Sequence, residues 1–79
     1  MIENLNFNIN GAVLTLVLEG SFASYKNQDK KLRLYAAAHN QQVQSIIIDA
    51  SKLVQWDSSL VAIIFELEKI SRRRGIKIE

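Results

Sequence analysis

The chain has 79 residues, a formal net charge of +2 and no cysteine. This length corresponds to one small domain, which buries only about 60% of its unfolded surface on folding. The lack of cysteine excludes a disulfide framework and a thiolate metal site. The longest apolar run, Leu60 to Phe65, is too short to span a membrane, and the one basic run, Arg72 to Arg74, does not imply nucleic-acid binding. We therefore expect a cytoplasmic domain that neither inserts into a membrane nor binds nucleic acid.

The first part of the sequence predicts a β-hairpin. From Leu5 to Asn10, apolar residues alternate with asparagines, as in a strand with one buried face. Asn10-Gly11 tolerates the positive φ angles of a two-residue hairpin turn. The apolar-rich segment from Ala12 to Glu19 is then the returning strand.

A helix is predicted after the hairpin, from about Tyr25 to His39, with Ser24 as its N-terminal cap. We expect its inward side to carry Leu32, Tyr35 and Ala36. Its basic residues are interpreted as a solvated surface; they are Lys26, Lys30, Lys31 and Arg33. His39 is interpreted as a C-terminal helix residue that interacts with the helix dipole, and a polar loop follows it.

The second part of the sequence predicts a strand, a helix and a further strand. Ile46 to Ile48 are β-branched without alternation, which predicts a mid-sheet strand covered on both faces. The next helix begins at Asp57 or Ser58 and ends near Arg74, where Gly75 supplies a left-handed residue. Its inward residues are predicted to be Leu60, Ile63, Ile64, Leu67 and Ile70.

These elements predict an α/β fold with a small mixed sheet that opens with a β-hairpin and carries two helices on one face. Residues 1–79 then form a single domain. The last strand, Ile76 to Glu79, has no covering element, so we expect the domain to be incomplete at its C-terminal end. An open sheet edge also predicts a homodimer, because a second copy can cover it.

Polar side chains are expected to meet where the central strand ends and the second helix begins. Asp49 and Ser51 follow the strand, and Asp57, Ser58 and Ser59 start the helix. A metal motif of the Asp-x-Ser-x-Ser type is not complete, because position 53 is leucine. The only histidine lies far from these serines along the chain, and no glycine-rich phosphate loop is present. We therefore predict no catalytic residues, no metal site, no cofactor and no enzymatic activity.

Asp57-Ser58-Ser59 is the strongest candidate for a partner-binding or regulatory site. Asp and Ser are preferred helix caps, so a purely structural role is one interpretation. The other is a site that responds to phosphate, because first-turn amides and the helix dipole favour an anion while Asp57 repels it. Trp56 either packs the loop onto the core or, if exposed, provides an anchor for a partner.

The motif Asp49-Ala50-Ser51-Lys52-Leu53, followed by Trp56-Asp57-Ser58-Ser59-Leu60 and an apolar helix that ends in Arg-Gly-Ile, resembles the STAS domain. This family is named for sulphate transporters and anti-sigma factor antagonists. The resemblance covers about thirty residues, and the preceding elements occur in the order of that fold. It implies a regulatory or protein-interaction domain without catalytic activity.

Two branches of the family give different expectations. The anti-sigma factor antagonists imply phosphorylation at Ser59, but Leu60 replaces the glycine that usually follows, and we expect it to alter the surface on which a kinase docks. Asp-Ser-Ser-Leu is similar to STAS domains that accompany the permease of bacterial lipid-asymmetry ABC transporters. That branch implies docking of the transporter ATPase around Ser58, at the cytoplasmic face of the inner membrane. We take the transporter branch as the main hypothesis and the phosphorylation-switched antagonist as the alternative.

Overall fold

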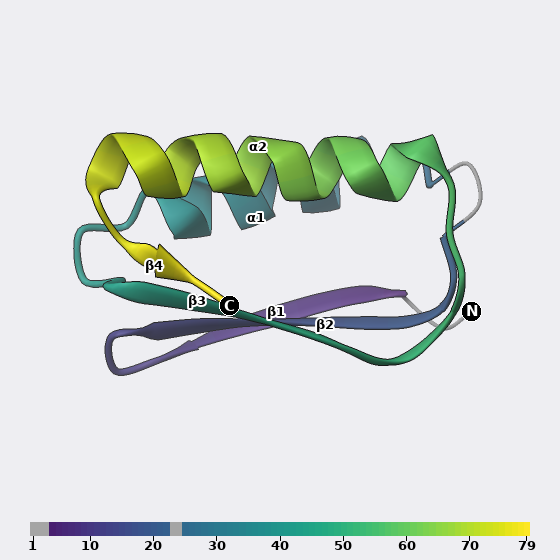
Figure 1. Ribbon diagram of the computed structural model, residues 1–79, viewed down its shortest axis with the longest axis horizontal. Coiled ribbons are helices and arrows are strands. Elements are labelled where there is room, and N and C mark those ends of the chain that lie inside the picture. Colours follow the sequence, from purple (N-terminus) through teal and green to yellow (C-terminus); the bar gives the residue numbers. More distant parts are fainter. Residues whose placement is uncertain (1–3, 23–24) are drawn as a thin grey trace.

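The computed structural model describes residues 4–22 and 25–79. This part of the chain forms a four-stranded sheet and two helices: β1 (Leu5–Asn10), β2 (Val13–Ser21), α1 (Gln28–Ala38), β3 (Ser45–Gln55), α2 (Ser58–Arg74) and β4 (Lys77–Ile78). The strand order is β1-β2-β3-β4, with β1 antiparallel to β2 and the other pairs parallel. Both helices lie on the same face of the sheet, α2 in front of α1 in Figure 1. The predicted mixed α/β architecture is confirmed.

The β-hairpin forms as predicted, but its two turn residues are Gly11 and Ala12 instead of Asn10 and Gly11. Leu5 pairs with Leu18 and Asn10 pairs with Val13, and Gly11 in the turn has a φ of 63°. The side chains that face the helices are fully or almost fully buried: Leu5, Leu14, Leu16 and Leu18. The apolar alternation of the sequence thus defines one face of the sheet as the floor of the core.

Strand β3 differs from the prediction in its burial and in its length. Ile46 is buried against the helices, but Ile47 is 38% exposed on the opposite face, which neither helix covers. The expectation of a strand covered on both faces is therefore wrong. β3 also continues through Asp49 to Gln55, because β2 provides a pairing partner along it as far as Ser21. A register shift opposite Leu18 accommodates this extension as a bulge.

Helix α1 begins at Gln28 rather than Tyr25. Its N-terminal cap is Asn27, whose side-chain oxygen accepts a hydrogen bond from the Lys30 N–H at 3.0 Å. The proposed cap Ser24 lies outside the described residues. The helix ends as expected next to His39, whose N–H bonds to the carbonyls of the preceding turn.

The inward face of α1 was predicted incorrectly. Leu34 and Ala38 are buried, whereas Leu32 is 56% exposed and Ala36 is also exposed. Only Tyr35 of the predicted set packs partly against the core. The four-residue spacing of Leu34 and Ala38 places both on the side of α1 that meets the core.

The basic face of α1 is not purely solvated. The ammonium of Lys30 lies 5.4 Å from the centre of the Phe7 ring on β1, and Lys30 is only partly exposed. The aliphatic stem of this lysine therefore covers the aromatic side chain at the edge of the core.

Helix α2 has the predicted bounds. Four of its five predicted inward residues are buried, Leu60, Ile63, Leu67 and Ile70, while Ile64 is partly buried at the margin of the core. Gly75 ends the helix with a φ of 69°. The chain then enters β4, which is held to β3 by two 2.9 Å hydrogen bonds of Glu79, one from its N–H to the Ile46 carbonyl and one from the Ile48 N–H to its carbonyl.

Candidate functional site

Asp49 and Ser51 do not lie where the sequence placed them. Both belong to β3, and the chain continues from them as a strand to Gln55 before it reaches α2. The Asp49 Oδ1 accepts hydrogen bonds from the Ser51 N–H at 3.0 Å and from the Ser51 hydroxyl at 2.7 Å. The hydrogen bond from the Ser51 hydroxyl, and to a lesser extent the one from the Ser51 N–H, holds the pKa of Asp49 below its ordinary value. The predicted meeting of this pair with Asp57 is therefore wrong, and the pair stabilises the local bulge.

The start of α2 is built around Asp57 and Ser59. Asp57 is the N-terminal cap, and its Oδ1 accepts a hydrogen bond from the Ser59 N–H at 2.9 Å. The same carboxylate oxygen lies 2.6 Å from the Ser59 hydroxyl. This is the capping geometry that the sequence predicted, with one addition, because the cap also holds a side chain of the first turn.

The hydroxyl of Ser59 also reaches the connection between β2 and α1. Its Oγ lies 2.9 Å from the Phe22 carbonyl and accepts a hydrogen bond from the Tyr25 N–H at 3.1 Å. A hydroxyl has one proton, so Asp57 and Phe22 share a single donor while Tyr25 uses a lone pair. No local sequence pattern signals this contact, because Tyr25 and Phe22 lie 34 and 37 residues before Ser59.

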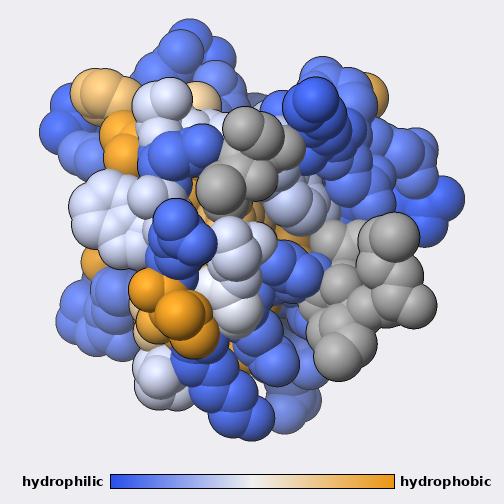
Figure 2. All heavy atoms as spheres, turned by 90° about the vertical axis from the view of Figure 1, so that its right-hand side faces the viewer, coloured by the Kyte–Doolittle hydropathy of each residue, from blue (hydrophilic) through white to orange (hydrophobic). Residues whose placement is uncertain are grey.

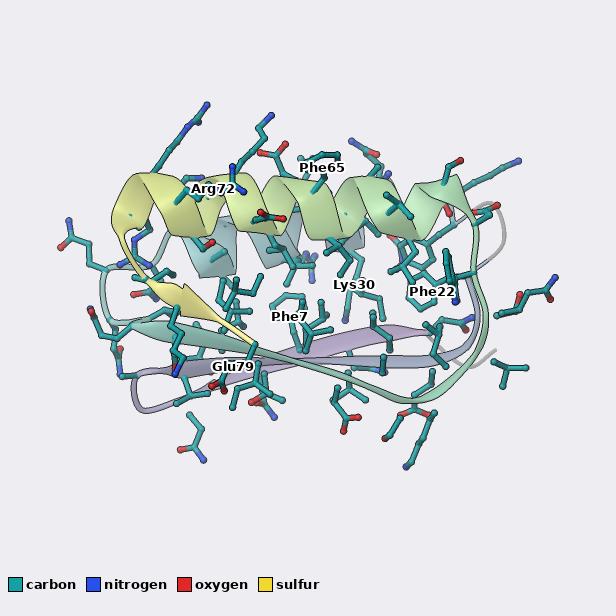
Figure 3. The ribbon with its side chains drawn as sticks, in the orientation of Figure 1. Phe7, Phe22, Lys30, Phe65, Arg72 and Glu79 are labelled. Carbon is teal, nitrogen blue, oxygen red and sulfur yellow. The ribbon has the colours of Figure 1, made fainter. Side chains whose placement is uncertain are left out.

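The two serines therefore differ in their surroundings. Ser59 is partly buried and joins α2 to the segment that leads into α1, next to the fully buried Phe22. Figure 3 shows Phe22 between the sheet and the first turn of α2. Ser58 is exposed at the first position of the helix. A modifying enzyme can approach Ser58 from solvent, whereas Ser59 is engaged inside the fold.

Trp56 does not pack onto the core as a staple. It is 60% exposed, and Val54, two residues earlier in β3, is 83% exposed. Trp56 borders an open groove along α2, lined by Leu60, Val61, Ile64, Phe65 and Glu68. The end-on view shows apolar groups that interrupt a largely hydrophilic surface (Figure 2). The second interpretation of Trp56, an exposed anchor for a partner, is the one that fits this geometry.

Leu60 corrects one argument from the sequence. It is only 5% exposed and belongs to the core beneath α2. Its side chain therefore adds little to the exposed surface around Ser58. Leu60 gives no reason to prefer the transporter branch over the antagonist branch.

Other polar groups of the described residues form no comparable site. Within residues 4–22 and 25–79, no group of His, Cys, Asp and Glu side chains could hold a metal ion. In the same part of the chain, neither helix has the length and apolar character to cross a membrane. Burial, and secondarily the negative charge of Glu66, raises the pKa of Tyr35 where α1 and α2 meet. This pair belongs to the packing of the helices.

A comparison with models of known protein families shows which family this chain belongs to. A family model described as the STAS domain matches residues 4–79. The chain belongs to the STAS family. STAS domains are typically non-catalytic regulatory or interaction domains. No curated protein matches the sequence.

Two similar solved structures are of the anti-sigma factor antagonist SpoIIAA, one in its unphosphorylated form and one, described as a Bacillus cell fate determinant, in its phosphorylated form. Each has 15% sequence identity to this STAS domain and a TM-score of 0.78, and the match covers 94% of this chain and 68% of SpoIIAA. At this identity the likeness shows the fold. Nothing in these comparisons points to the lipid-transporter branch.

Proposed function

We propose that this STAS domain is a protein-interaction switch of the anti-sigma factor antagonist kind, in which the phosphorylation state of Ser58 controls partner binding at the start of α2. The proposal rests on one observation, which is that the two serines differ in exposure and in hydrogen bonding. Ser58 is exposed next to the exposed Trp56, whereas the Ser59 hydroxyl is held by Asp57, Phe22 and Tyr25. The fold shared with a protein solved in phosphorylated and unphosphorylated forms supports it.

The geometry favours Ser58 over Ser59, which the resemblance implied as the phosphoacceptor. Phosphorylation of Ser59 would replace the hydroxyl proton that the Asp57 carboxylate and the Phe22 carbonyl share, and it would place the phosphate next to that carboxylate. A phosphate on Ser58 leaves these bonds in place. Accessibility and the retention of the cap therefore select the first serine of the pair.

A phosphate on Ser58 would change the electrostatics of the docking surface more than the fold. The positive end of the α2 dipole favours the added charge, while the neighbouring Asp57 carboxylate opposes it. These effects act in opposite directions, so the free energy of unfolding should change little. The surface beside Trp56 would gain a bulky dianion, and an apolar or acidic partner surface docked there would be released.

Docking of a lipid-transporter ATPase, the main hypothesis from the sequence, would use the same surface around Ser58. Its distinguishing argument was the leucine after the two serines, and Leu60 is buried. We therefore propose the antagonist-like switch as the function, and transporter association becomes an outcome that the binding experiment can detect.

The experiment combines modification with binding. The chain and its Ser58→Ala and Ser59→Ala variants are incubated with labelled ATP and a purified serine kinase of the anti-sigma factor class, and the products are mapped by mass spectrometry. We expect phosphate on Ser58 in the wild type and in Ser59→Ala, and none in Ser58→Ala. Binding to that kinase is measured in parallel by calorimetry, where Ser58→Glu should weaken it and Arg33→Ala, an exposed change on α1, should not.

Two results would contradict this function. One is phosphate on Ser59 with Ser58 unmodified, because that would mean that the buried hydroxyl is the acceptor. The other is the absence of both phosphorylation and kinase binding together with Ser58-dependent binding of a transporter ATPase subunit, which would favour the transporter branch.

A further inference from the structure

We propose that helix α1 opens and closes as a unit while the sheet and α2 stay folded. Two side chains of α2 hold it closed, Ser59 near the start of α1 and Arg74 at its end. Such a helix is a conformational device, because the free energy of its opening depends strongly on a few polar contacts. The opening itself does not depend on phosphorylation of Ser58.

Apolar packing holds α1 less firmly than α2. Within Gln28–Ala38, the fully buried side chains are those of Leu34 and Ala38. Because apolar stabilisation follows buried area, one leucine and one alanine contribute much less than the large apolar side chains that α2 buries, which are Leu60, Ile63, Leu67 and Ile70. Elements with few buried apolar contacts open locally at a lower free energy than the rest of a domain.

The other contacts of α1 lie at its margins. Asp29 and Arg33 form an exposed ion pair within the helix itself, which does not tie α1 to another element. The ammonium of Lys30 lies 5.4 Å from the centre of the Phe7 ring on β1, at the edge of the core. Firm polar contacts to the rest of the fold are therefore found at the two ends of α1.

The N-terminal latch joins the first turn of α2 to the segment that leads into α1. It consists of Ser59 with Phe22 and Tyr25. The Ser59 Oγ accepts a hydrogen bond from the Tyr25 N–H at 3.1 Å and lies 2.9 Å from the Phe22 carbonyl oxygen. Asp57 fixes this hydroxyl from a distance of 2.6 Å, and the rings of Phe22 and Tyr25 lie 4.9 Å apart. One hydroxyl of α2 therefore holds the entry to α1 in place.

The C-terminal latch consists of Arg74 with the carbonyls of Ala38 and Gln41. Its Nη1 donates to the Ala38 carbonyl at 3.0 Å and its Nη2 donates to the Gln41 carbonyl at 3.4 Å. The last carbonyls of a helix have no partner within the helix, and a cation beside them also opposes the negative end of the helix dipole. Arg74 of α2 thus caps the end of α1. Figure 3 shows Phe22 and Arg72 near opposite ends of α2, so the two latches act far apart.

Opening of α1 would change the surface at the start of α2. The N-terminal latch uses the same Asp57 and Ser59 that form the cap beside the exposed Ser58. A partner that contacts this corner in its closed form binds better when α1 is closed, so its binding and the closure of α1 are thermodynamically linked. Such a partner would slow the opening of α1. This consequence, unlike the opening itself, rests on the proposed function.

Hydrogen exchange of the intact chain, followed by NMR under conditions in which the opening is at equilibrium, measures the proposed motion. The amides of residues 32–38 should exchange about tenfold or more faster than the slowest amides of β2 and α2. Ser59→Ala should speed the exchange of α1 by about tenfold or more, and Arg74→Ala by about fivefold or more. The matched controls are the exposed neighbours, and neither Ser58→Ala nor Arg73→Ala should change the exchange of α1.

A substitution far from α1 separates its local opening from unfolding of the whole domain. Gly11 has a φ of 63° in the turn between β1 and β2, so Gly11→Ala should speed exchange in β2 and β3 by about fivefold or more. The exchange of α1 should stay unchanged, because this turn remains folded when α1 alone opens. The proposal is overturned if the α1 amides exchange as slowly as those of β2, if Gly11→Ala speeds them equally, or if both latch variants leave their rates unchanged.

Discussion

Replacement of Ser59 by alanine is expected to destabilise the domain clearly more than replacement of the adjacent Ser58. The Ser59 hydroxyl donates one hydrogen bond, shared between Asp57 and the Phe22 carbonyl, and accepts one from the Tyr25 N–H. At a net contribution of about 0.5–1.5 kcal/mol for each bond, Ser59→Ala should lower the free energy of unfolding by about 1–3 kcal/mol. Ser58 is exposed, so Ser58→Ala should stay within about 0.5 kcal/mol of the wild type.

The assay is urea and thermal unfolding followed by far-ultraviolet circular dichroism. For a domain of this size, each kcal/mol corresponds to about 4–8 °C in the melting temperature, so Ser59→Ala should melt roughly 4–24 °C below the wild type. The urea m-value should be unchanged, because the surface exposed on unfolding is the same. Equal melting temperatures for Ser58→Ala and Ser59→Ala would refute the idea that Ser59 joins α2 to the β2–α1 connection.

Three further predictions concern the end of α2 and the two perturbed titrating groups. Gly75→Ala should lower the free energy of unfolding by about 1–2 kcal/mol, because Gly75 has a φ of 69°, which a residue with a Cβ atom disfavours. An unchanged midpoint of urea unfolding would contradict this prediction. Ser51→Ala should raise the pKa of Asp49 toward its ordinary value in an NMR titration. The contribution of Asp49 to stability is present above the pKa that this residue has in the unfolded chain, and it is lost as the pH falls through the lower pKa of the folded state. Glu66→Gln should lower the raised pKa of Tyr35, seen as earlier phenolate absorbance with increasing pH, and no change would mean that burial alone raises it.

Local signals were sufficient to predict the hairpin and α2. The hairpin needs only the asparagine alternation and a turn glycine at position 11, which act over neighbouring residues, although the turn begins one residue later than predicted. The bounds of α2 follow from the Asp57 cap at one end and Gly75 at the other. Caps and turns depend on short-range sterics and hydrogen bonds, so a sequence contains them almost completely.

Long-range packing determined what the sequence could not show. β3 extends through the polar Ser51 and Lys52 because β2 pairs along it, and no local pattern marks that partner. The inward face of α1 is set by its contact with the sheet and α2, so Leu34 is buried and Leu32 is exposed although both are equally apolar. The same limit applies to the site, because the contacts that distinguish Ser59 from Ser58 come from Phe22 and Tyr25.

The geometry at the start of α2 assigns different residues to the two interpretations of Asp57-Ser58-Ser59, the structural cap and the regulatory site. Its first turn combines an exposed Ser58 with a Ser59 whose hydroxyl is held by Asp57, Phe22 and Tyr25. A charge added at Ser58 acts on the end of the helix, where its field is strongest, and is screened within about 10 Å at ordinary ionic strength. Ser58→Glu should therefore alter partner binding while the melting temperature stays close to that of the wild type, whereas Ser59→Ala should lower the melting temperature.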